Sequence, residues 1–86
     1  MKKEFKITYL TTKLGLPENS LRSNIVYQGD DYNIFEIIFK NTDGKFYKTT
    51  YIDNNGLINL RQRNGNVICK EVVPKNISIT IWEELD

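Results

Sequence analysis

Residues 32–52 read YNIFEIIFKNTDGKFYKTTYI, and this stretch decides the fold. Its aromatic and β-branched residues alternate with polar ones, which predicts one strand over residues 32–41 and another over residues 46–52. Between them lies Thr42-Asp43-Gly44. An Asp-Gly pair between two apolar runs is a strong short-range signal for a β-hairpin, because both residues adopt positive φ at low cost.

The length of this loop sets the register of the predicted hairpin. A two-residue loop at Asp43-Gly44 would exchange the faces of one strand. A three-residue loop with Gly44 at the bulge pairs Phe39 with Tyr47 and Phe35 with Tyr51, so that the aromatic side chains share one face. We therefore expect the three-residue loop and a core face that consists of Phe35, Ile37, Phe39, Tyr47 and Tyr51.

Similar turn signals recur along the chain, at Gly29, Gly56 and Gly65. They separate seven expected strands, at residues 4–10, 23–28, 32–41, 46–52, 57–62, 67–73 and 77–83. Residues 11–22 lose the alternation and predict a loop, with at most one short helical turn near residues 16–22. Pro74 should end the sixth strand, because it cannot donate a hydrogen bond. We expect a single all-β domain over residues 1–86, a small antiparallel meander that forms a curled sheet or a barrel.

Composition narrows the classes of function and the compartment. The net charge is +1, so no overall field calls for nucleic acid or a membrane surface. No apolar run approaches the length of a membrane span, and the first residues lack the apolar stretch of a signal peptide. Cys69 is the only cysteine, which rules out an internal disulfide. These features predict a cytoplasmic protein without a membrane partner.

Residue types that commonly carry catalysis are scarce. The chain has no histidine, so the commonest general base and metal ligand is absent, and one cysteine cannot form a Cys-x-x-Cys site. Glu36 falls on the second face of the central strand, where we expect it to pair with Lys48 across the sheet. A buried catalytic glutamate is the alternative. We expect a protein that is not an enzyme and that uses no cofactor or metal.

Two groups of residues could bind a partner. Trp82, with Glu83 and Glu84 beside it, would make an anchor with an acidic rim if it points away from the face formed by Ile77, Ile79 and Ile81. Alternatively, Trp82 closes the second face of the sheet or packs on the loop at residues 11–22. The second group is basic and could form a nucleic-acid-binding face or simply a solvated one: Lys45, Lys48, Arg61 and Arg63.

Cys69 itself is expected to be a small buried residue opposite Leu60.

Four segments of the later chain carry a resemblance: YNIFEIIFK at 32–40, GKFYK at 44–48, CKEVVP at 69–74 and ITIWE at 79–83. Together they resemble the small accessory proteins of phages and mobile elements of low-GC Gram-positive bacteria. The resemblance covers roughly residues 30–84 and implies a genomic setting, without catalytic residues. Accessory proteins of this kind include inhibitors of host defence, such as anti-CRISPR proteins.

The leading expectation is therefore a non-enzymatic binding protein that inhibits a host protein, such as a CRISPR effector, in the cytoplasm of the host cell. One alternative is a small nucleic-acid-binding β-barrel. Further alternatives are an antitoxin or immunity-type protein, and a structural homo-oligomer that assembles through an unpaired edge strand at residues 4–10 or 77–83. The chain is expected to be a monomer or a small homo-oligomer.

Overall fold

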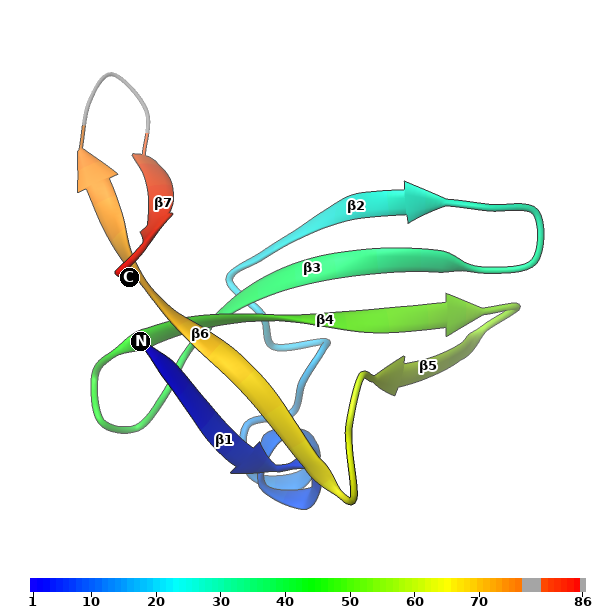
Figure 1. Cartoon of the computed structure of the whole chain (residues 1–86), viewed down its shortest axis with the longest axis horizontal. Helices are drawn as coiled ribbons and strands as arrows, with labels where there is room; N and C mark the ends of the chain where they lie inside the picture. Colours follow the sequence, from blue (N-terminus) through cyan, green and yellow to red (C-terminus); the bar gives the residue numbers. More distant parts are fainter. Residues whose placement is uncertain (77–79, 86) are drawn as a thin grey trace.

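The computed structural model describes residues 1–76 and 80–85, which form one antiparallel sheet of seven strands (Figure 1). The strands are β1 (Lys2–Lys6), β2 (Arg22–Gln28), β3 (Asn33–Lys40), β4 (Phe46–Asn54), β5 (Leu57–Leu60), β6 (Asn66–Asn76) and β7 (Thr80–Glu84). The expected all-β meander is confirmed. The sheet stays open and does not close into a barrel.

Strand order explains why the sheet branches. β2, β3 and β4 form a meander, and the other edge of β4 is shared by two strands. β6 pairs with its beginning, at Phe46–Lys48, and β5 pairs with its end, at Tyr51–Asn54. β6 is shared in the same way, because the Glu71 amide donates to the Met1 carbonyl at 2.7 Å and the Glu71 carbonyl accepts from the Leu85 amide at 3.2 Å. β1 and β7 therefore follow one another along one edge of β6.

The predicted register of the β3–β4 hairpin is confirmed. Phe39 lies opposite Tyr47, and Phe35 lies opposite Tyr51. The loop is closed by the Gly44 amide, which donates to the Asn41 carbonyl at 3.0 Å. Gly44 has a φ of 85°, a left-handed conformation that side chains with a Cβ rarely adopt. The three-residue loop thus forms as its sequence predicts.

The hydrophobic core lies on one face of the sheet. The central members of the predicted core face are buried, with Ile37 0%, Phe39 1% and Tyr47 3% exposed. Tyr51 packs against the core as a partly buried residue, and Phe35 stacks on Tyr51 with ring centroids 5.0 Å apart. Other strands and the segment after β1 complete the core with Phe5, Leu10, Leu16, Leu60, Val67 and Cys69.

The first predicted strand, at residues 4–10, is too long. β1 ends at Lys6, and a π-helical turn, η1 (Tyr9–Lys13), follows it. The turn carries Leu10 onto the core, where it is fully buried, and this burial outweighs the strand-like alternation. The helical turn thus lies before residues 16–22, where the sequence predicted at most one short helical turn and where residues 16–19 form a hydrogen-bonded turn.

The prediction that Pro74 ends its strand is wrong. β6 continues through Pro74, which lies opposite Trp82 of β7. Backbone groups alternate between the two edges of a strand. Since Glu71 faces β1 and β7, the nitrogen of Pro74 faces the other edge, where pairing with β4 ends at Val72. The missing N–H costs no hydrogen bond of the ladder.

Cys69 is buried as expected, but its partner is not Leu60. Cys69 lies opposite Lys3 of β1, and Leu60 lies opposite Tyr51 of β4. β6 does not pair with β5: a single bridge between Arg63 and Asn66 closes the turn at Asn64-Gly65, and β6 then pairs with β1 and β4. The predicted inward orientation of Ile77, Ile79 and Ile81 lies outside what the structure describes.

Candidate functional site

Trp82 lies on the second face of the sheet, which is the face opposite the core. Its ring packs on Phe46 of β4, with ring centroids 5.0 Å apart and planes tilted by 54°, and the Lys40 ammonium lies 5.8 Å from the Phe46 ring centre. Trp82 is partly buried, and Val72, opposite Phe46 on the same face, is 1% exposed. This placement agrees with the alternative in which Trp82 closes the second face.

Glu84 belongs to a chain of ion pairs across the second face. Its carboxylate lies 2.8 Å from the Lys70 ammonium and 3.4 Å from the Lys48 ammonium, and Lys48 also lies 3.8 Å from Glu36. Lys48 and Lys70 are direct cross-strand neighbours, so Glu84 relieves the repulsion between two like charges. Hydrogen bonds from Lys70 and then Lys48 hold the pKa of Glu84 below its ordinary value. The expected pairing of Glu36 with Lys48 is confirmed.

The acidic residues beside Trp82 therefore do not form one rim. Glu84 is engaged with two lysines on the second face. Glu83 precedes it in β7, so its side chain projects from the opposite face. Trp82 and Glu84 share the second face, and the sheet separates the Glu83 side chain from both of them.

The branch in the sheet creates hollows on the second face. Between the parts of β4 that pair with β6 and with β5, the Thr50 carbonyl accepts a hydrogen bond from the Arg61 amide at 3.1 Å. One hollow of about 250 Å³ is lined by Glu36, Lys48, Thr49, Thr50, Ile68 and Lys70. Its neighbour, of about 230 Å³, is lined by Thr49, Thr50, Arg61, Gln62, Arg63, Asn66 and Ile68. Ile68 is 56% exposed and is shared by both.

The structure brings together three of the four basic residues that the sequence singled out. Lys48, Arg61 and Arg63 line these adjoining hollows. Lys45 lies in the β3–β4 loop, where its backbone amide donates to Asp43 at 2.9 Å, and it is absent from both linings. The Arg61–Thr50 hydrogen bond holds Arg61 beside β4, and Ile68 of β6 belongs to both hollows.

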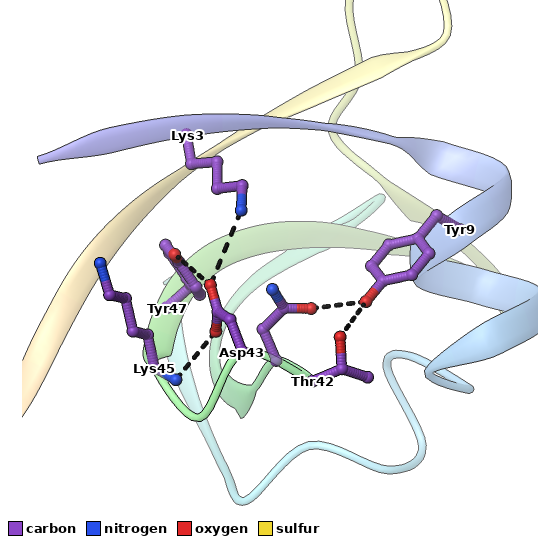
Figure 2. A network of polar contacts seen from close by, with 7 residues as sticks. Lys3, Tyr9, Thr42, Asp43, Lys45 and Tyr47 are labelled. Atoms are coloured by element: carbon purple, nitrogen blue, oxygen red, sulfur yellow. Dashed lines mark hydrogen bonds and ion pairs between the residues drawn. The ribbon is translucent and has the colours of Figure 1, made fainter.

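A polar network joins the β3–β4 loop to the beginning of the chain (Figure 2). The Asp43 carboxylate lies 3.6 Å from the Lys3 ammonium and accepts a hydrogen bond from the Tyr47 hydroxyl at 3.2 Å. The Tyr9 hydroxyl donates to the Asn41 side chain at 2.6 Å and contacts the Thr42 hydroxyl at 3.2 Å. Tyr9 and Asn41 are 32 residues apart, and no local pattern in the sequence indicates their contact.

The network shifts two titrations. The hydrogen bond from the Lys45 amide, with smaller contributions from Asn41, Tyr47 and Lys3, holds the pKa of Asp43 below its ordinary value. Burial, and next the hydrogen bond to Asp43, raises the pKa of Tyr47 to about 12. The network therefore ties the β3–β4 loop to β1 through Lys3 and to η1 through Tyr9.

β2 forms an outer edge of the sheet and carries exposed apolar side chains. Every residue of β2 is exposed, and among the described strands only β3 pairs with it (Figure 1). Its apolar side chains are half exposed, with Ile25 at 53%, Val26 at 54% and Tyr27 at 48%. A shift in register between Ile25 and Tyr27 makes Val26 the extra residue of a β-bulge. The sequence predicts a strand at residues 23–28, but its local pattern does not show that this strand lies at an outer edge.

Within the described ranges, 1–76 and 80–85, no three potential ligands of the His, Cys, Asp or Glu type come together to hold a metal ion. In the same ranges, no helix has the length and apolar character needed to cross a membrane. Comparison with protein-family models, with curated proteins and with solved structures gave no match.

Proposed function

We propose that this chain is a non-enzymatic binding protein whose partner is another protein, which docks on the outer edge of β2. The observation that carries the proposal is a seven-residue strand that is exposed throughout and unpaired on one side among the described strands. Such an edge offers free backbone groups to a partner strand, and main-chain hydrogen bonds then supply the affinity.

Side chains of β2 add specificity to such a contact. Ile25 lies opposite Phe35 and Tyr27 lies opposite Ile34, so the two project from opposite faces of the sheet. A strand added beside them would therefore meet an apolar side chain on each face. Leu21, which precedes β2, is 57% exposed and extends the apolar edge.

The biological role within this proposal is inhibition of a host protein by a product of a phage or mobile element. A defence component such as a CRISPR effector is the target class that we propose. The resemblance of residues 30–84 to accessory proteins of low-GC Gram-positive phages supports it. Trp82 with Glu83 and Glu84 is a weaker docking site than β2, because Trp82 packs on Phe46 and Glu84 is held by two lysines.

Nucleic-acid binding is the second candidate function, because Lys48, Arg61 and Arg63 line adjoining hollows. Two features place it second. Lys48 is already paired with Glu36 and Glu84. In addition, neither lining contains an aromatic side chain, whereas single-strand-binding proteins usually stack bases on such rings.

The test is affinity purification of the tagged protein from a low-GC Gram-positive host, with and without nuclease, using the parent chain and Ile25→Lys. A lysine at the centre of an edge strand opposes strand addition. Leu57→Lys is the matched control, because Leu57 is 69% exposed on β5. We expect a stoichiometric, nuclease-resistant partner that is lost with Ile25→Lys and kept with Leu57→Lys. Retention of the partner by both variants contradicts docking at β2, and recovery of nucleic acid alone favours the second candidate.

A further inference from the structure

The hollow between β4 and the β5–β6 connection contains two arginines on a fixed backbone. The Arg61 amide donates to the Thr50 carbonyl at 3.1 Å. Arg63 and Asn66 exchange two backbone hydrogen bonds, of 2.7 Å and 3.0 Å. Both arginines therefore leave the backbone at defined positions, and both line the same hollow of about 230 Å³.

The charge of these arginines is not balanced locally. Neither Arg61 nor Arg63 forms an ion pair with a carboxylate in the described part of the chain. The lining of their hollow contains no acidic residue, and its other polar members are Thr49, Thr50, Gln62 and Asn66. Lys48, in the adjoining hollow, has two carboxylates within 4 Å. Positive charge that is available to a ligand is thus concentrated at Arg61 and Arg63.

Acidic residues lie beyond the arginines on both sides. Glu36 lines the adjoining hollow. Glu4 lines a third hollow together with Arg63, Asn64, Asn66 and Ile68, and it accepts a hydrogen bond from the Asn66 side chain at 3.0 Å. Glu36 shares its hollow with Lys70 and with Lys48, whose ammonium lies 3.8 Å from the Glu36 carboxylate, whereas Glu4 is the acidic member of the hollow that also contains Arg63.

We propose that the Arg61–Arg63 hollow binds a carboxylate of an acidic segment from a protein partner. The guanidinium group presents paired donors that match a carboxylate, and two such groups in one hollow suit an Asp or Glu side chain. Ile68, 56% exposed at the junction of the hollows, offers an apolar contact to a neighbouring side chain of the segment. Glu4, in the third hollow, favours a basic residue on that side of the bound carboxylate.

A protein segment fits these hollows better than a nucleic acid does. A phosphate chain carries a negative charge at every unit, and it would meet Glu4 as well as the arginines. No aromatic ring lines the three hollows to stack a base. The inference rests on the protein partner proposed above but concerns another surface, so the β2 contact and the arginine contact can fail independently.

The test is an NMR titration of the labelled full chain with an acetylated Lys-Gly-Glu-Glu-Gly-Lys peptide. We expect saturable shifts of the amides of residues 61–68, and no saturable shifts with a peptide in which glutamine replaces glutamate. Arg61→Gln with Arg63→Gln should weaken binding about tenfold or more, because the charge-assisted hydrogen bonds from both guanidinium groups to the carboxylate are lost. Lys13→Gln, which removes one positive charge outside the hollows, is the control and should bind like the parent chain.

Three results would overturn the arginine site. The first is that the parent chain does not bind the glutamyl peptide, and the second is that the glutamine peptide binds equally well. The third is that the double variant binds the glutamyl peptide with unchanged affinity while the NMR signals of its other residues show the native fold. An oligothymidylate that binds the same amides more tightly than the glutamyl peptide would also overturn it, in favour of nucleic acid. None of these results bears on β2, which the Ile25→Lys comparison tests separately.

Discussion

Replacement of Trp82 by alanine distinguishes a structural tryptophan from a docking anchor. A fully buried tryptophan contributes about 3–5 kcal/mol over alanine. Trp82 is only partly buried and has Phe46 as its ring partner, so we expect a loss of about 2 kcal/mol in the free energy of unfolding, roughly half of that range. For a domain of this size, that loss lowers Tm by about 10 °C.

A double-mutant cycle isolates the contact of the two rings. Trp82→Ala, Phe46→Ala and the double variant should give a coupling free energy of about 1 kcal/mol, the usual size for an aromatic pair. Trp82 is the only tryptophan, so unfolding is followed by circular dichroism in denaturant rather than by fluorescence. Leu57→Ala is the control, and we expect it to change stability by less than about 0.5 kcal/mol because Leu57 is exposed.

The outcome decides the role of the indole. A coupling near zero, together with unchanged stability of Trp82→Ala, would refute the conclusion that Trp82 closes the second face. Loss of partner binding by such a stable variant would restore Trp82 as the anchor.

Three further changes test other parts of the fold. Asp43→Asn should destabilise the protein at pH 7, because the pKa of Asp43 in the folded state lies below its ordinary value of 3.8, so that the carboxylate contributes stability above that pH and loses this contribution as pH falls through the folded value. A stability difference between the variant and the parent chain that does not shrink below about pH 4 would contradict the role of charge. Gly44→Ala should lower the free energy of unfolding by about 1 kcal/mol through its φ of 85° alone, since a Cβ there would meet no atom within 4 Å. Gly44→Asn should lower it less, and equal losses of the two variants in thermal melts would refute this reasoning. The Cys69 thiol is fully buried and burial raises its pKa to about 12, so Ellman's reagent should react with it only as fast as the protein unfolds, and rapid reaction at pH 8 would show that the thiol is accessible.

The sequence predicted the parts of the fold that local rules control. The β3–β4 register follows from one turn and one alternating pattern, both within about twenty residues. The partners of β6 do not follow from such rules, because a turn at Asn64-Gly65 equally permits a hairpin with β5. Its pairing with β1 and β4 depends on how the whole core packs.

The candidate sites were predictable to a lesser degree. Glu36 and Lys48 belong to one hairpin, so their pairing could be predicted. The hollow around Arg61 and Arg63 depends on the divergence of β5 and β6, because residues of β6 form part of its lining. The burial of Trp82 depends on its contact with Phe46, which lies on a strand distant in sequence. The run Ile25-Val26-Tyr27 was visible in the sequence, but only the strand order shows that it lies at an outer edge.

The sharing of the β4 edge between β5 and β6 has a consequence for the route of folding. β2 to β5 are joined by short loops, so they can assemble from contacts that are close in sequence. β1 must wait for β6, because Lys2 pairs with Lys70 and Lys6 pairs with Asn66, and closing so long a loop is slow. We therefore expect the four-strand meander to form the nucleus and the docking of β1 to come after the rate-limiting barrier. Substitutions in β1 would then accelerate unfolding and leave the folding rate nearly unchanged.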